Sequence, residues 1–406
     1  MHLTAQLAIT GLLVALLPLS LVWVATDADR FRKLVGLTLF LTFDLIVFGG
    51  FTRLTDSGLG CPDWPGCYGQ ANPLQAHADI SAAQAAMPTG PVTVFKAWIE
   101  MIHRYLAMAV GVLIVALMLL AWRRWWQARR QRIADTGVSP VAGSSPWLPT
   151  ALFGFVCLQG AFGAWTVTLK LQPVIVTTHL LLGMSLLGLL AWLKAQQDAL
   201  QDTLHSGHPL THAFAGGVAA PDLRLPAVVA LVALAMQIAL GGWVSTNYAT
   251  LACTDFPLCH GQLIPEMDYA HGFSLWRKLG MTAAGAYLPF AALTAIHWTH
   301  RNFAFVVIAA NLWLAVRAMR VPPMRNHAGW LIGALCLQFF TGVATIYLQW
   351  PLALAVAHNA GAALLVLLLT MLNYKAFRAA RTWPDRDAAR IPTVQPIATA
   401  ARATPI

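Results

Sequence analysis

Long apolar runs constrain the fold of this chain more than any other feature of its sequence. A segment crosses a bilayer only as an α-helix or within a closed β-barrel, because the hydrocarbon offers no water to its backbone polar groups. A spanning helix needs roughly 20 apolar residues. Nine such runs lie at about 5–25, 33–51, 98–121, 149–169, 174–194, 226–246, 300–319, 328–348 and 353–374. The sequence therefore predicts an all-α polytopic membrane protein.

Composition excludes the soluble classes of protein. Of the 406 residues, 58% are hydrophobic and only 10% are charged, whereas a soluble domain carries about a quarter charged residues. The net charge of +10 follows from membrane orientation, since 19 of the 26 Lys and Arg residues lie near 30–33, 123–132, 194–224 and 317–325 and in the tail from residue 375. By the positive-inside rule these segments are cytoplasmic. The N-terminus then faces outward, the C-terminus faces the cytoplasm, and no nucleic-acid partner is expected.

Residues 279–296 are apolar enough to be considered as a tenth span. Counting them would reverse the orientation of every later segment and place the basic tail outside. The equivalent stretch of the first half of the chain, about 71–97, is an outer loop. We therefore expect residues 279–296 to form a loop or an amphipathic segment at the outer surface.

The chain also repeats itself with an offset of 192 residues. Residues 61–70 read Cys-Pro-Asp-Trp-Pro-Gly-Cys-Tyr-Gly-Gln, and residues 253–262 read Cys-Thr-Asp-Phe-Pro-Leu-Cys-His-Gly-Gln. A glycine pair precedes each stretch by the same distance, at 49–50 and at 241–242. Self-similarity at a fixed offset indicates two related halves, so a site in one half should have a counterpart in the other.

The repeat gives a domain organisation with two pseudo-symmetric four-helix transmembrane bundles. Each half holds four spans in the same orientation, which predicts a pseudo-twofold axis along the membrane normal. Bundle cores commonly hold cofactors between facing helices. The predicted divisions are an extra N-terminal span (1–31), a first bundle (32–197), a cytoplasmic linker (198–225), a second bundle (226–380) and a disordered cytoplasmic tail (381–406).

Four of the thirteen histidines lie inside spanning segments near their outer ends. A single intramembrane imidazole is more often a hydrogen-bonded core residue, but four at equivalent positions favour a function. A zinc or copper site would need three or four convergent ligands, and each bundle offers two. Two facing imidazoles suit the iron of a haem, so we predict one haem per half. The four predicted ligands are His103, His179, His300 and His358.

Three arginines accompany these histidines. Arg104 and Arg301 directly follow His103 and His300, and Arg53 lies at the mouth of the first bundle. We expect them to meet haem propionates at the outer surface. The alternative is that they extend to the membrane interface without a ligand.

The two halves differ beside these histidines. Glu100 lies three residues before His103, on the same helix face, whereas the counterpart before His300 is His297. A carboxylate in one site could relay protons or stabilise a cationic intermediate. The alternative is an acidic residue favoured near a helix N-terminus. The asymmetry suggests that one haem is chemically modified and the other passes electrons.

The six cysteines fall into three groups. Two pairs lie in outer loops, where two short-loop disulfides are expected, Cys61 with Cys67 and Cys253 with Cys259. Such small loops leave redox and local shaping roles open beside stabilisation. Cys157 and Cys336 lie within spans and are expected to be small buried packing residues. Asp44 lies in the middle of a span and has neither a counterpart in the second half nor a visible partner.

With these motifs the chain resembles the haem A synthase family of bacteria and mitochondria, over about residues 32–375. The resemblance is carried by Gly-Gly-Phe-Thr-Arg-Leu-Thr-Asp-Ser-Gly-Leu-Gly at 49–60, Glu-Met-Ile-His-Arg at 100–104, His-Trp-Thr-His-Arg at 297–301, and the lone His179 and His358. It implies oxidation of the C8 methyl of haem O to a formyl group by two successive hydroxylations. The product would be haem A for cytochrome c oxidase.

The resemblance also implies roles for individual residues. His300 and His358 would ligate a haem b, while His103 and His179 would hold the haem O substrate, with Glu100 acting beside it. The paired loop cysteines would serve redox or haem-transfer steps, and haem O synthase would be the partner that supplies substrate. The location would be the bacterial inner membrane, with the cysteine loops in the periplasm. The sequence names no electron donor or acceptor and leaves a homo-oligomer open.

Two other classes of function are compatible with four bundle histidines. One is a di-haem b-type membrane electron-transfer cytochrome, and the other is a haem transporter or chaperone. The carboxylate in only one half and the outer cysteine loops favour the enzyme. Product analysis separates the three classes, since only the enzyme produces a formyl-bearing haem.

Overall fold

The computed structural model describes residues 2–24, 30–134, 145–206 and 222–382, and the regular elements within these ranges are helices. Nine described helices have the length and apolar composition to cross a membrane, which confirms the all-α polytopic fold. They are α1 (Leu3–Val24), α2 (Arg30–Leu54), α4 (Val94–Ala134), α5 (Trp147–Thr168), α6 (Pro173–Ser206), α7 (Arg224–Thr246), α9 (Phe290–Ala318), α10 (Arg325–Tyr347) and α11 (Leu352–Thr382).

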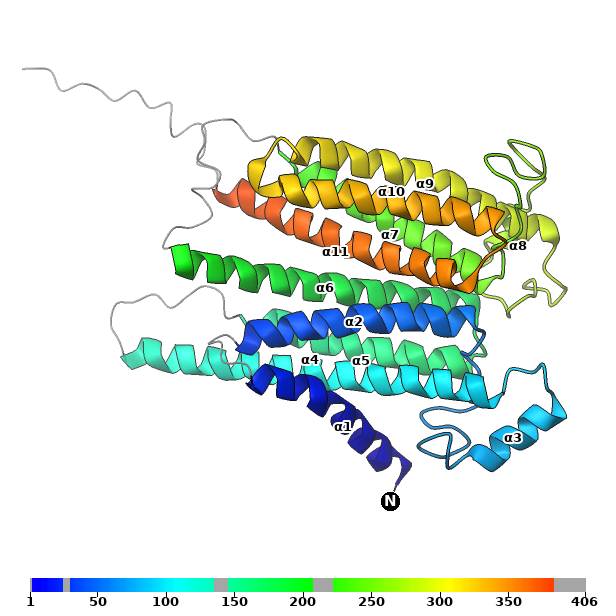
Figure 1. Ribbon diagram of the computed structural model, residues 1–406, viewed down its shortest axis with the longest axis horizontal. Helices are drawn as coiled ribbons and strands as arrows, with labels where there is room; N and C mark the ends of the chain where they lie inside the picture. The colour runs from blue at the N-terminus through cyan, green and yellow to red at the C-terminus, as the bar shows by residue number, and fades with distance from the viewer. Residues whose placement is uncertain (1, 25–29, 135–144, 207–221, 383–406) are drawn as a thin grey trace, which may run out of the picture.

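The spanning helices lie side by side with roughly aligned axes, except that α1 crosses at an angle (Figure 1). In a first set, α2 packs on α4 and α6, and α5 packs on both of those helices. In a second set, α7 packs on α9 and α11, and α10 packs on both of those. The sets join through contacts of α6 with α7 and of α11 with α2 and α6. The three short helices are α3 (His77–Ala86), α8 (Tyr269–Gly272) and η2 (Pro322–Met324).

This packing has the form expected of two related four-helix bundles, although the domain boundaries stay a prediction. The predicted linker 198–225 begins inside α6, which continues to Ser206, and residues 207–221 lie outside the described residues. The predicted tail 381–406 begins at the last residues of α11, and residues 383–406 also lie outside them. Buried apolar side chains of both sets form one continuous core.

The apolar segment 279–296 is a loop for most of its length. The Thr282 N–H donates to Ala286 O, and the Leu288 N–H donates to Gly280 O, which closes a small hairpin. The prediction of a loop or an amphipathic surface segment is confirmed as a loop up to residue 289, and its location on the outer side stays a prediction. Residues 290–296 instead form the first turns of α9, which pack against α8.

The extra N-terminal span has a defined place on the first set. Leu7, Gly11 and Ala15 face inward along one stripe of α1. A methyl group on Gly11 would lie 2.9 Å from Cβ of Met108 in α4, so the two helices approach closely here. Leu3 and Leu7 also pack into the apolar cluster that holds Cys61 and Cys67. The span therefore covers the first cysteine loop as well as α4.

A polar network joins the two sets at the helix ends that precede the cysteine loops. Arg53 donates to the carbonyl oxygen of Ser245 at 2.7 Å and to Asp56 Oδ1 at 3.0 Å. The Tyr248 hydroxyl donates to the same Asp56 oxygen at 2.7 Å, and the Arg53 guanidinium lies 4.4 Å from the Tyr248 ring centroid. Both Arg53 with Ser245 and Asp56 with Tyr248 are 192 residues apart. Residues thus meet their own counterparts, as positions beside a twofold axis do.

Cys157 and Cys336 are exposed on α5 and α10, so the prediction that they are buried packing residues is wrong. Hydropathy does not distinguish a helix face that meets other helices from one that meets lipid. Both cysteines lie on the outward face, where a small thiol is as compatible with hydrocarbon as with a protein core.

The nine spans predict the location of the C-terminus. An odd number of crossings places the termini on opposite sides, and the basic segments favour a cytoplasmic C-terminus. Green fluorescent protein fused after Ile406 should be fluorescent, and alkaline phosphatase fused there should be inactive. As a control, phosphatase fused after Ala86, the last residue of α3 between α2 and α4, should be active. An active phosphatase at the C-terminus would show that the orientation is the reverse of the predicted one.

Candidate functional site

Each of the four intramembrane histidines lies against a glycine on a neighbouring helix. A methyl group added to any of these glycines would lie 3.0–3.3 Å from the imidazole Cε1 atom, closer than ordinary van der Waals contact. The rings therefore occupy space that a side chain would otherwise take. The pairs are Gly49 with His103, Gly163 with His179, Gly241 with His300, and Gly342 with His358.

Glutamine lies one helical turn before three of these glycines. Gln159 Nε2 donates to the carbonyl oxygen of His179, and Gln237 Nε2 donates to that of His300, both at 3.1 Å. Gln338 Nε2 lies 3.2 Å from Nε2 of His358. The corresponding residue before Gly49 is Leu45. Glutamine and glycine thus position three of the histidines, and the fourth is positioned differently.

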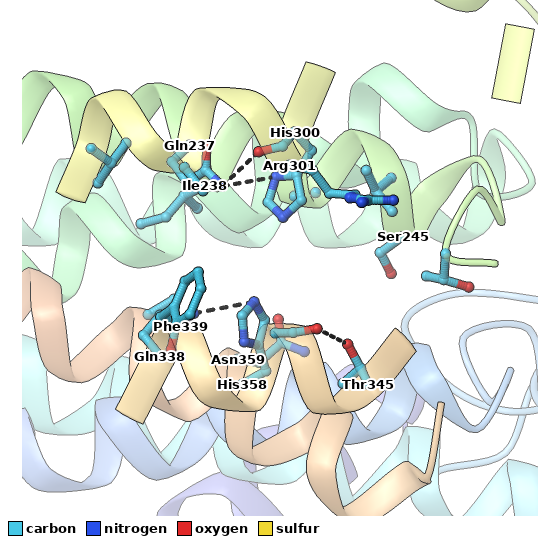
Figure 2. Close-up of a pocket in the computed structure, with 18 of the residues that line it drawn as sticks. Gln237, Ile238, Ser245, His300, Arg301, Gln338, Phe339, Thr345, His358 and Asn359 are labelled. Carbon is cyan, nitrogen blue, oxygen red and sulfur yellow. Dashed lines mark hydrogen bonds between the residues drawn. The ribbon is translucent and has the colours of Figure 1, made fainter. Parts of the chain in front are cut away.

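A cavity lies between α7, α9, α10 and α11 (Figure 2), and His300 and His358 project into it from opposite sides. The Thr341 hydroxyl lies 3.0 Å from His358 Nδ1 and helps to orient that ring. Apolar side chains form most of the remaining wall, and three of them, Leu54, Leu180 and Met184, come from the first set of helices. Two imidazoles facing one another across an apolar cavity fit a planar macrocycle with a central metal ion.

In the first set, His103 on α4 and His179 on α6 form the corresponding pair. The Nδ1 atoms of both rings are buried without a hydrogen-bond partner among the described residues. Gln159 Oε1 beside them is likewise buried and unpartnered. Buried polar atoms are nearly always satisfied, so this set of unpartnered atoms is consistent with a site that binds a ligand with polar or metal-coordinating requirements. The residues present fit a haem here too.

Glu100 is almost fully buried and is held from two directions. Its Oε2 atom accepts from the backbone N–H of Cys61 at 2.7 Å, and its Oε1 atom accepts from Arg104 Nη2 at 2.6 Å. Arg104 also donates to the carbonyl oxygens of Pro65 and Gly66. The carboxylate therefore connects the helix that carries His103 to the first cysteine loop.

The second set repeats this arrangement with an imidazole in place of the carboxylate. His297 Nδ1 accepts from the backbone N–H of Cys253 at 3.1 Å. Arg301 Nη2 donates to the carbonyl oxygens of Pro257 and Leu258 at 3.2 and 3.0 Å. Glu100 and His297 therefore both bind the first cysteine of a loop, one through a carboxylate and the other through an imidazole.

The three arginines proposed to bind propionates differ in their surroundings. Arg53 is engaged in the network between the sets, and Arg104 is engaged by Glu100 and the first cysteine loop. Arg301 lines the cavity of the second set, and its Nη1 atom is buried without a hydrogen-bond partner among the described residues. Arg301 is thus the one of the three with a free donor at a cavity. The propionate role stays a prediction for all three.

Both predicted disulfides are present, Cys61–Cys67 and Cys253–Cys259. An aspartate two residues after the first cysteine closes each loop. Asp63 accepts from the N–H groups of Tyr68 and Gly69, and Asp255 accepts from those of His260 and Gly261. The Gly261 N–H, with that of His260, holds the pKa of Asp255 below its usual value. Both glycines have positive φ, 69° and 72°, which glycine adopts readily.

The sequence predicted the four histidines but not the neighbouring residues that position them. The glycine contacts, Gln237 and Thr341 were not predicted as site residues. The signal for the glutamines was present, since Gln237, Gln159 and Gln338 each stand four residues before a glycine.

Comparison with known proteins places this architecture among described families. Residues 32–370 match the family described as Cytochrome oxidase assembly protein, COX15-CtaA. The chain is 36% identical over 342 residues to "Heme A synthase" of Shewanella oneidensis, covering 84% of this chain and 95% of that protein. It is 28% identical over 375 residues to "Heme A synthase" of a Chelativorans species, covering 87% and 94%. For the protein of that name from a Bradyrhizobium species, identity is 30% over 385 residues, covering 89% and 94%.

The glycine contacts can be tested on a single helix. In Gly342→Ala the new methyl group would lie 3.0 Å from His358 Cε1, so the ring must shift, at a cost of about 1–3 kcal/mol. The variant should bind less haem and unfold at a lower temperature, as measured by the haem-to-protein absorbance ratio and by thermal unfolding in detergent. Gly333→Ala on the same helix is the control, because that methyl group meets no heavy atom within 4 Å. Equal behaviour of the two variants would contradict the proposed packing.

Proposed function

This chain belongs to the COX15-CtaA family of cytochrome oxidase assembly proteins and has the function of a haem A synthase, and we propose that it oxidises the C8 methyl of haem O to a formyl group. In each of two hydroxylations a hydroxyl group replaces one hydrogen of the methyl carbon, and the two electrons removed from that carbon pass to an oxidant outside this chain, either O2 or another electron acceptor. The gem-diol formed by the second hydroxylation loses water to leave the formyl group. The observation that favours this reaction is the single buried carboxylate, Glu100, beside one of two otherwise similar histidine pairs.

We assign the substrate to the first set of helices. His103 and His179 hold haem O there, and their unpartnered nitrogens support a ligand between them. Glu100 lies within one helical turn of His103, where it can hold or move a proton near the substrate. Its hydrogen bonds from Arg104 and from Cys61 fix the position of the carboxylate.

We assign a haem b to the second set, between His300 and His358. Gln237, Gln338 and Thr341 orient these rings, and most of the cavity wall is apolar. When bound, this haem would supply one-electron chemistry to the first site. Arg301, with its unpartnered Nη1 atom, is the residue of this chain best placed to bind a propionate.

We also propose a source for the substrate and an orientation in the membrane. The substrate would come from haem O synthase, and both cysteine loops would lie in the periplasm of a bacterium, with the C-terminus in the cytoplasm. An electron-transfer cytochrome or a haem transporter would also use histidine pairs. Neither accounts for a buried carboxylate in only one half.

The reaction can be tested by extracting haem from the purified full-length protein after expression together with a haem O source. We expect haem b accompanied by haem A or its hydroxylated precursor, identified by mass. Haem b alone, despite available haem O, would favour the electron-transfer cytochrome, and unchanged haem O would favour the transporter.

The role of Glu100 can be separated from its structural contacts. Glu100→Gln keeps an oxygen that accepts from the Cys61 N–H but removes the carboxylate charge. Haem content should stay near the wild-type level, while haem A output should fall about 10²-fold or more, with the hydroxylated precursor accumulating. His297→Gln is the matched change in the second set, and it should preserve haem A output. Undiminished output from Glu100→Gln would exclude the proposed role.

A further inference from the structure

Asp44 is an acidic residue in the middle of a spanning helix that neither histidine site uses. It is exposed on the surface of α2 and has no hydrogen bond or ion pair with any described residue. At about 1.5 Å per residue, it lies roughly 15 Å from the outer end of that helix. An ionisable side chain at this depth is costly in lipid and usually indicates a function.

Position 44 lies on the side of α2 opposite its contacts with α4 and α11. On this helix, Gly49 faces His103 and Gly50 faces Asn359 of α11. Successive residues are rotated by about 100°, so position 44 lies nearly opposite the direction midway between these two glycines. Asp44 therefore cannot serve the first histidine pair or the contact between the two sets.

The second half provides an internal comparison. The counterpart of Asp44 at the offset of 192 is Met236 on α7, which is 51% exposed. One turn before Asp44, Phe40 is 60% exposed on the same face of α2. A methionine and a phenylalanine at these positions are compatible with lipid, whereas an aspartate is not. The replacement makes this face of α2 different from the corresponding face of α7.

The described spans of a second copy of this chain do not supply a suitable partner. Within the described spans, the basic side chains lie near the helix ends or at the two histidine sites. A symmetric contact through α2 would place one Asp44 beside another. The complementary charge must therefore come from a different protein.

We propose that the face of α2 formed by Phe40 and Asp44 binds a spanning helix of another membrane protein, which places a basic side chain against Asp44. Phe40 supplies the apolar contact one turn away, and the carboxylate fixes depth and orientation. An ion pair in hydrocarbon is specific, because leaving either partner alone exposes an uncompensated charge to lipid.

The experiment uses the full-length protein in membranes of its own host. Phe40 is replaced by the photoreactive residue p-benzoylphenylalanine, and the same residue at position 236 provides the matched control. After irradiation, the adducts are purified and the linked peptide is sequenced. We expect position 40 to yield a spanning peptide of another protein that contains Lys, Arg or His, and position 236 to yield lipid adducts.

The proposal requires the adduct at position 40 to depend on the charge of residue 44. With Asp44→Leu, the adduct at position 40 should fall at least about tenfold, and Asp44→Glu should retain most of it. Asp44→Lys should abolish the adduct, and an acidic residue in place of the partner's basic residue should restore it. Because position 44 is exposed, Asp44→Leu should keep the wild-type haem content, which verifies folding. Lipid adducts alone at position 40, an adduct with a second copy of this chain, or a yield independent of residue 44 would each overturn the proposal.

Discussion

Four imidazole rings pack against glycines of neighbouring helices. The relative positions of the spanning helices depend on these contacts. In each half, two adjacent glycines near the C-terminal end of one helix make different contacts. Gly49 and Gly241 admit the rings of His103 and His300 from the same set. The next residues, Gly50 and Gly242, face helices of the opposite set, at Asn359 and Leu180. One short motif thus fixes both the position of a histidine and the joint between the sets, so the two sites cannot move apart independently.

The two sites share a scaffold and differ at a few positions. Glu100 and His297 both accept a hydrogen bond from the backbone N–H of the first cysteine of a loop, so each loop is held to the helix that carries the histidine. What changes is the chemistry left beside the histidine, a carboxylate in one site and an imidazole in the other. The exchange of Gln237 for Leu45 is a second difference of this kind. Substitutions of this kind can therefore change the chemistry of one site while they leave the packing of both sets intact.

The spans, the two disulfides and the position of the four histidines were predictable, because hydropathy and repeat spacing report them directly. The start of α9 at Phe290 was not, since its first turns are supported by loop contacts and not by lipid burial. The partners of Arg53 and Arg104 could not be predicted either, because they are carbonyls and side chains brought close only by the tertiary fold. The exposure of Cys157 was mispredicted for a related reason, as an apolar run does not reveal which face of the helix meets lipid.

The N-terminal span gives the two cysteine loops unequal protection. Leu3 and Leu7 of α1 lie over the first loop, with a Leu3 methyl carbon 3.1 Å from where a side chain on Gly66 would begin. No described helix takes the equivalent position over Cys253–Cys259. Substitution or removal of Leu3 and Leu7 would therefore act directly on one loop and, through Glu100, on His103. Changes in α1 therefore affect the first histidine site, whereas no described helix gives the same access to the second.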